Sequence, residues 1–133
     1  MENKFNISLR LISEAYDFKK LIPKINGYEI LYNKKGDNIT KSGSFKARSN
    51  VLVINDFYTC NKIDDENNDI IINKLIPIIE TLSVIDVNDL TREIYITGTI
   101  EDQQFGFSIN LDLINLLEKN KYKFSFSGIS LWE

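Results

Sequence analysis

The clearest hydrophobic pattern in this chain of 133 residues lies in its last third. Residues 105–109 alternate apolar and polar side chains, which is typical of a strand with one buried face. Leucine and isoleucine then recur at helical spacing over 111–119, where Asn110 is placed to cap the helix. Residues 122–126 alternate again. The stretch therefore predicts a strand, a helix and a second strand that share one core.

The same two periods continue through the rest of the chain. They predict further strands at 5–11, 28–32, 45–59 and 93–100, and helices at 15–25 and 71–82. Pro23 should shorten or end the first of these helices, whereas the apolar period continues through Pro77, so we expect a kink there. Residues 51–54 are apolar on both faces, which predicts a strand that lies centrally or is covered on both sides.

These elements follow the order β-α-β-β-α-β-β-α-β. That order predicts an α+β fold, a mainly antiparallel sheet with helices on one face, as a sandwich of ferredoxin-like character. The length is that of a single globular domain spanning residues 1–133. We expect the second sheet face to be open and polar, with small or polar side chains from several strands: Asn6, Ser8, Arg10, Thr97, Thr99, Ser125 and Ser127.

The residue types exclude most familiar catalytic sites. The chain has no histidine, which removes Ser-His and Cys-His pairs and most transition-metal sites. Cys60 is the single cysteine, and no base is placed to activate it. Phosphate-binding glycine motifs are missing, and the acidic run 64–69 lacks the glycine and glutamate of a calcium loop. We therefore expect no catalytic residue, no metal and no cofactor.

Composition and charge bear on location and partners. No apolar stretch is long enough for a signal core or a membrane span, and one cysteine suits a reducing compartment, so we expect a cytoplasmic protein. Residues 1–50 carry ten Lys and Arg against five Asp and Glu, whereas residues 51–133 carry six against fourteen. The net charge of −3, with few aromatic residues expected on the open face, argues against a nucleic-acid partner.

Several stretches together resemble a bacterial family, the domain of unknown function 4279. They are residues 5–11, the helix ending before Gly27, the Lys-Lys-Gly-Asp loop at 34–37, the helix at 71–82 and the closing run 107–118. The resemblance covers nearly the whole chain. It implies a small cytoplasmic bacterial protein without established catalysis, sometimes associated with toxin-immunity loci, and it supplies no catalytic residues.

Three functional hypotheses follow. The first is a non-enzymatic binding protein, an immunity protein that inhibits a basic toxin through acidic side chains suited to electrostatic steering: Asp64, Asp65, Glu66, Asp69, Asp86, Asp89, Glu101 and Asp102. The alternative is a regulatory domain that binds a small molecule or nucleotide on the open sheet face, with these candidate residues: Arg10, Lys34, Lys35, Thr97 and Thr99. The least favoured is a hydrolase that uses carboxylates, because no glycosidase or nuclease pattern surrounds them.

Overall fold

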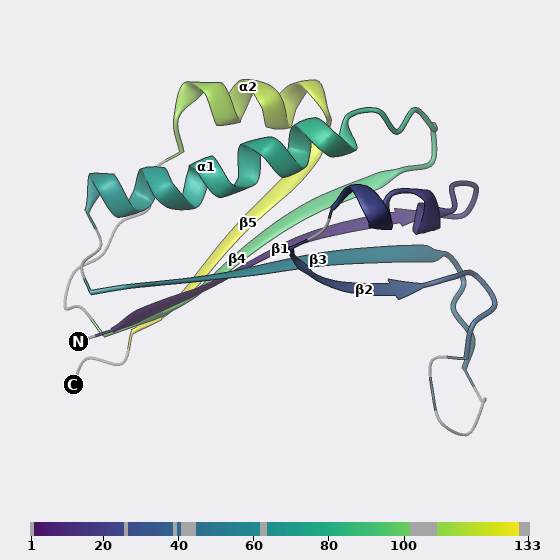
Figure 1. Cartoon of the computed structure of the whole chain (residues 1–133), viewed down its shortest axis with the longest axis horizontal. Helices are drawn as coiled ribbons and strands as arrows, with labels where there is room; N and C mark the ends of the chain where they lie inside the picture. Colours follow the sequence, from purple (N-terminus) through teal and green to yellow (C-terminus); the bar gives the residue numbers. More distant parts are fainter. Residues whose placement is uncertain are drawn as a thin grey trace.

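A computed structural model describes residues 2–25, 27–38, 40, 45–61, 64–101 and 109–130. In this part of the chain, two α-helices lie across one face of a five-stranded sheet (Figure 1). The strands are β1 (Asn3–Ser13), β2 (Glu29–Asn33), β3 (Asn50–Cys60), β4 (Thr91–Ile100) and β5 (Tyr122–Ser130). The helical segments are α1 (Asp65–Leu82), α2 (Leu111–Lys119) and two 3-10 turns, η1 (Phe18–Lys20) and η2 (Ile22–Lys24).

The sheet has the order β2-β3-β1-β4-β5, with β1 at its centre. Strand β1 is antiparallel to both neighbours, and β2 is antiparallel to β3. Strand β5 runs parallel to β4, because the chain crosses over through α2 before it returns to the sheet. The α+β class is thus confirmed, but the sheet is mixed and the ferredoxin-like order is not confirmed. The strand predicted at 105–109 lies almost entirely outside the described residues.

The predicted helix at 15–25 is wrong in type. Two consecutive 3-10 turns occupy this segment instead. The Asp17 carboxylate caps the first turn by accepting from the Lys19 backbone N–H, and Pro23 lies at the start of the second turn. Proline there cannot donate the hydrogen bond that would continue an α-helix, so the segment stays in short turns. Pro77, by contrast, lies inside α1 and the helix continues past it, as predicted.

The core lies between the helices and one face of the sheet. Alternate residues of β1 from Phe5 to Leu11 are at most 3% exposed, and Leu52, Ile54, Ile94 and Ile96 extend this buried layer over β3 and β4. Helix α1 covers it with six buried side chains: Ile71, Ile72, Leu75, Ile78, Ile79 and Leu82. Helix α2 adds Leu113 and Leu117. The apolar face of the sheet and the apolar faces of the two helices therefore bury each other, and this burial stabilises the fold.

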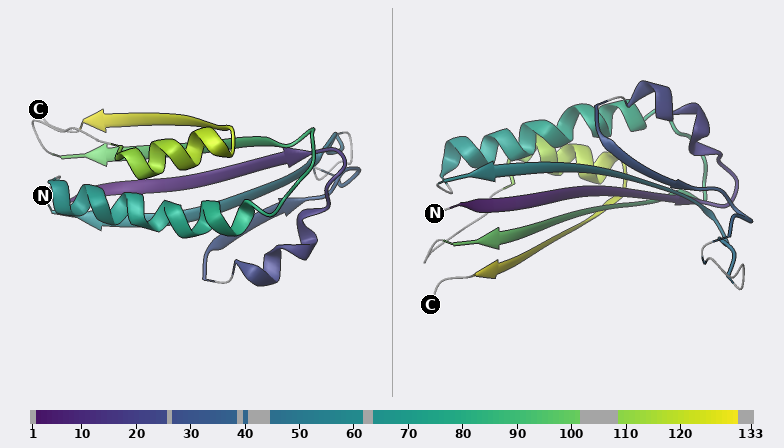
Figure 2. Two further views of the ribbon diagram at one scale, coloured as in Figure 1. Left: turned by 90° about the horizontal axis from the view of Figure 1, so that it is seen from above. Right: turned by 60° about the horizontal axis from the view of Figure 1, so that its bottom comes forward.

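All the helical segments lie on this one side of the sheet. Figure 2 shows α1, α2 and the two 3-10 turns together, with none of them over the opposite face. Strand β3 lies inside the sheet, as the run 51–54 predicts, yet only one of its faces is covered. The fold therefore leaves one face of the sheet uncovered by the described residues. No helix among them is long and apolar enough to cross a membrane.

Candidate functional site: the uncovered sheet face

The uncovered face is polar over β1 and β4. Asn6 lies opposite Thr97 in the register, and Ser8 lies opposite Tyr95, so these side chains share the face. The Ser8 hydroxyl donates to the Asn55 side-chain oxygen of β3. Hydrogen bonds between neighbouring side chains therefore order this half of the face, whose polar character the alternation predicts.

The β3 side of the same face is mainly apolar, with Asn55 as a polar residue between Val53 and Phe57. Leu31, Val51, Val53 and Phe57 form what we call the β3 stripe, in which Leu31 of β2 lies opposite Val53 of β3. Leu31 is 55% exposed and Phe57 is 57% exposed, while the two valines are half-buried. This stripe was not predicted, because the run 51–54, apolar on both faces, indicated only a strand that lies centrally or is covered on both sides. The apolar residues at alternate positions between Val51 and Phe57 could have indicated the stripe in the sequence.

A tyrosine and a glutamate interact on β4, which β1 separates from the β3 stripe. The Tyr95 hydroxyl donates to Glu93 Oε2 at 2.7 Å. This hydrogen bond to a carboxylate raises the pKa of Tyr95. Arg10 of β1 lies opposite Glu93, and the Asn6 side-chain oxygen is buried without a hydrogen-bond partner among the described residues. Arg10, Glu93 and Tyr95 therefore lie near one another on the neighbouring strands β1 and β4.

The acidic residues predicted to bind a partner do not form one surface. Asp64, Asp65, Glu66 and Asp69 lie at the start of α1, which is near the end of β3, and Glu101 directly follows β4 at the same end of the sheet. Asp86 and Asp89 lie in the connection between α1 and β4, at the opposite end. Asp102 lies outside the described residues. The structure thus divides the predicted set between two ends of the molecule.

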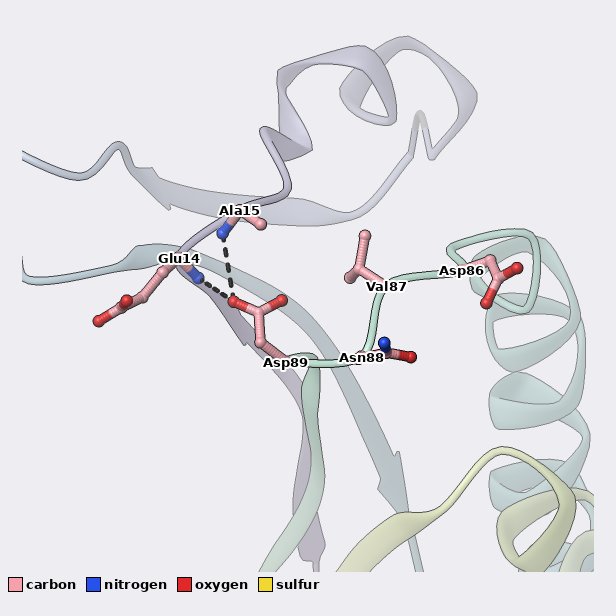
Figure 3. Close-up of a pocket in the computed structure, with 6 residues that line it drawn as sticks. All are labelled: Glu14, Ala15, Asp86, Val87, Asn88 and Asp89. Atoms are coloured by element: carbon pink, nitrogen blue, oxygen red, sulfur yellow. Dashed lines mark hydrogen bonds between the residues drawn. The ribbon is translucent and has the colours of Figure 1, made fainter.

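Asp89 has a structural role at its end of the sheet. Its carboxylate accepts hydrogen bonds from the Ser13 hydroxyl at 2.8 Å, from the Glu14 N–H at 2.7 Å and from the Ala15 N–H at 3.2 Å. These bonds lower the pKa of Asp89, the Ser13 bond most. Figure 3 shows Asp89 directed at the two backbone N–H groups, within an open hollow of about 680 Å³. The Asp89 carboxylate therefore links the connection before β4 to the segment that follows β1. Both of its oxygens already accept hydrogen bonds from these donors.

Asp64 also has a structural role, as the N-cap of helix α1. Its side chain accepts from the Asn67 backbone N–H at 3.0 Å, at the start of α1. Asp65 and Glu66 follow in the first turn, where the helix dipole favours negative charge. The acidic run at 64–69 therefore stabilises the start of α1, and this structural role explains its position without a binding site.

The residues predicted to bind a small ligand do not converge either. Lys34 and Lys35 follow β2, where their backbone N–H groups donate to Asp37 and Asn50. Thr97 and Thr99 lie further along the sheet, opposite Asn6 and Lys4. Arg10 and Asn6 are four residues apart on β1, about 13 Å at the usual strand rise. Arg10 alone of this set borders a hollow on the uncovered face.

The shifted pKa values give no group that titrates near neutral pH. Burial raises the pKa of Tyr32 to about 12 and that of Tyr122 to about 12, and it also raises the pKa of Tyr58. The hydrogen bond from the Tyr32 hydroxyl lowers the pKa of Asp17. These phenols stay protonated and the carboxylate stays ionised at neutral pH. Within the described ranges, no cluster of three or more His, Cys, Asp or Glu could hold a metal ion.

Comparisons with protein families, with curated proteins and with solved structures found no match to this chain. The resemblance to the domain of unknown function 4279 therefore stays a prediction. Among the described residues, the fold presents one sheet face that no helix covers.

Proposed function

We propose that this chain is a non-enzymatic binding protein that docks another protein on the uncovered face of its sheet. The observation that carries the proposal is the β3 stripe, where Leu31 and Phe57 are each more than half exposed. Exposed apolar side chains gathered on one face, among polar ones, are typical of protein interaction sites, whereas singly scattered apolar residues are ordinary. An immunity protein that covers a bacterial toxin in the cytoplasm, as the family resemblance implies, is the kind of binding protein we propose.

The strength expected of such a contact can be estimated from Phe57. A phenylalanine buries roughly 200 Å² when fully covered. Because 57% of Phe57 is still exposed, a partner that covers it removes about 110 Å² from water. At about 25 cal/mol per Å² the removal of this area from water is worth about 3 kcal/mol. The entropy lost on association reduces what appears as affinity, so a hundredfold change is roughly the upper bound for this anchor.

The partner's chemistry follows from the other side chains on this face. Lys4, Arg10 and Lys123 lie on it together with Glu29 and Glu93. The complementary surface is therefore apolar at its centre, where it meets the β3 stripe, and mildly acidic around it. The acidic residues at the start of α1 favour a basic partner instead, as the charge distribution in the sequence suggested. They form the competing binding site that the test has to distinguish from the β3 stripe.

A second apolar surface has to be weighed against the β3 stripe. Leu111 is 68% exposed and Ile114 is 45% exposed on the outer side of α2, one helical turn apart. This pair is smaller than the stripe and lies on the opposite side of the molecule from the uncovered face. It offers a matched control, because serine substitutions there remove a similar exposed apolar area.

The test compares three tagged variants with the wild type in lysate of the host cells, with bound proteins quantified by mass spectrometry. Leu31→Ser with Phe57→Ser should reduce capture of a stoichiometric partner at least tenfold, with little loss of stability because both side chains are exposed. Leu111→Ser with Ile114→Ser should leave capture unchanged. Loss of capture in Asp65→Asn with Glu66→Gln, but not in the stripe variant, would replace the proposal with the basic-partner hypothesis.

A further inference from the structure

A hollow of about 320 Å³ opens on the uncovered face, at the end where β2 finishes and β3 begins. Val51 and Ile12, which lie opposite each other on β3 and β1, give its floor an apolar part, and Asn33 of β2 lies on the other side of Val51. Its remaining lining comes from Arg10 of β1 and from the segment before β3, residues Ala47, Arg48 and Ser49. Three separate parts of the chain, residues 10–12, Asn33 and residues 47–51, thus meet in one place.

The lining carries two positive charges and no negative one. Arg10 and Arg48 are its charged residues, in a chain whose net charge is −3. Among the residues that the structure describes, neither guanidinium takes part in a hydrogen bond or an ion pair. Glu93 lies opposite Arg10 but accepts from Tyr95. Both arginines therefore keep their donors available to a ligand.

The wall that holds Arg48 is built into the fold. Ala47 is buried, and its backbone N–H donates to the backbone carbonyl of Asp37 at 2.8 Å. Its own backbone carbonyl accepts from the Gly36 N–H at 2.9 Å. Asn50 is also buried, and its side chain binds the Lys35 N–H and the Tyr16 oxygen. The backbone on both sides of Arg48 is thereby anchored, so the hollow is preformed rather than a loose loop.

We infer that this hollow binds a small organic anion, a carboxylate or phosphate group carried on an apolar body. Two guanidinium groups suit the planar, bidentate recognition of such oxyanions. The Asn33 amide and the Ser49 hydroxyl add neutral donors, and the floor of Ile12 and Val51 accepts the apolar part. The volume corresponds to the small end of known ligand sites. The inference does not depend on protein docking, since it concerns the isolated chain.

The neighbouring hollows have different chemistry. The one around Asp89 has three acidic residues in its lining and no basic one. A third hollow, of about 460 Å³, carries Arg92, Lys119 and Lys121 but also Asp86, and Arg92 already donates to the Ile85 oxygen at 3.1 Å. Two arginines without a hydrogen bond or ion pair among the described residues, together with apolar side chains in the floor, thus distinguish the Arg10 and Arg48 hollow.

The experiment titrates the purified protein with benzoate, adenosine monophosphate and inorganic phosphate, by calorimetry and by NMR shifts of the Ile12 and Val51 methyl groups. Benzoate or adenosine monophosphate should bind saturably and shift both methyl signals. Arg10→Gln and Arg48→Gln should each weaken that binding roughly tenfold or more. Lys4→Gln, which removes a cation from the same face of β1 outside the lining, should change it by less than about twofold.

Melting temperatures of the variants check that they fold, which is expected because both arginines are exposed. Saturable binding by none of the three probes would overturn the inference. Binding that survives both arginine substitutions would overturn it too, as would phosphate binding as tightly as the organic anions, because the apolar floor would then contribute nothing.

Discussion

Gly98 makes room for Phe5 in the core, and adding one methyl group there tests the packing directly. The two residues lie opposite each other on β4 and β1. A Cβ at Gly98 would lie 3.0 Å from Phe5 Cε1, 3.2 Å from Phe5 Cδ1 and 3.4 Å from Ile100 Cδ1. Phe5 is 3% exposed, so its ring cannot swing into solvent. Gly98→Ala therefore has to displace a packed ring.

Two opposing effects set the magnitude. Overpacking a core costs about 1–3 kcal/mol, whereas replacing glycine by alanine stabilises a strand by about 0.4–1 kcal/mol through the unfolded state. The overpacking is larger, so we expect Gly98→Ala to lower the free energy of unfolding by about 1 kcal/mol. For 133 residues this corresponds to a melting temperature lower by about 4 °C.

A double-mutant cycle measured by urea unfolding separates this clash from other causes. Phe5→Leu alone should cost about 1 kcal/mol through lost packing. In the Gly98→Ala background it should cost close to nothing, because the smaller side chain relieves the contact. A coupling energy of about 1 kcal/mol is therefore predicted. Additive effects, with coupling below about 0.5 kcal/mol, would refute the reasoning that the ring and the new methyl compete for one space.

Three further predictions concern single groups. Asp89→Asn should lower the melting temperature at pH 7. Because hydrogen bonds lower the pKa of Asp89 in the folded state, its contribution to stability should be present above about pH 4 and be lost as the pH falls further. Acid unfolding of the wild type and of the variant measures this difference. Tyr122→Phe should stabilise the protein by about 1 kcal/mol in thermal unfolding, since its buried hydroxyl has no partner among the described residues. Lys121→Gly should stabilise by about 0.5–1 kcal/mol in the same assay, because Lys121 has a backbone φ of 58°.

Most elements of the fold could be predicted from periodicity and capping. The alternation located β1 and β4, and Asn110 caps α2 by accepting from the Leu113 N–H as expected. The direction of β5 could not be predicted, because it depends on how many strands precede α2 in the sheet. Residues 15–25 were predicted as a helix because apolar spacing alone does not distinguish an α-helix from successive 3-10 turns.

The candidate surface was predictable only in part. Alternation placed the polar side chains of β1 and β4 on an open face, and they lie there. The run at 51–54 indicated a strand that lies centrally or is covered on both sides. It could not show that Val51 and Val53 stay uncovered, because a run that is apolar on both faces does not say how many faces the helices reach. Arg10 and Arg48 line the same hollow because β1 pairs with β3, and one sequence does not reveal this pairing.

Photo-crosslinking from position 57 tests the central claim most directly. Phe57→p-benzoylphenylalanine is produced in the host cells beside Ile114→p-benzoylphenylalanine, so that one probe lies on the β3 stripe and its control on the outer side of α2. The docking account predicts one crosslinked protein from position 57, absent from position 114. Crosslinks from position 114 alone, or none from position 57, would contradict it.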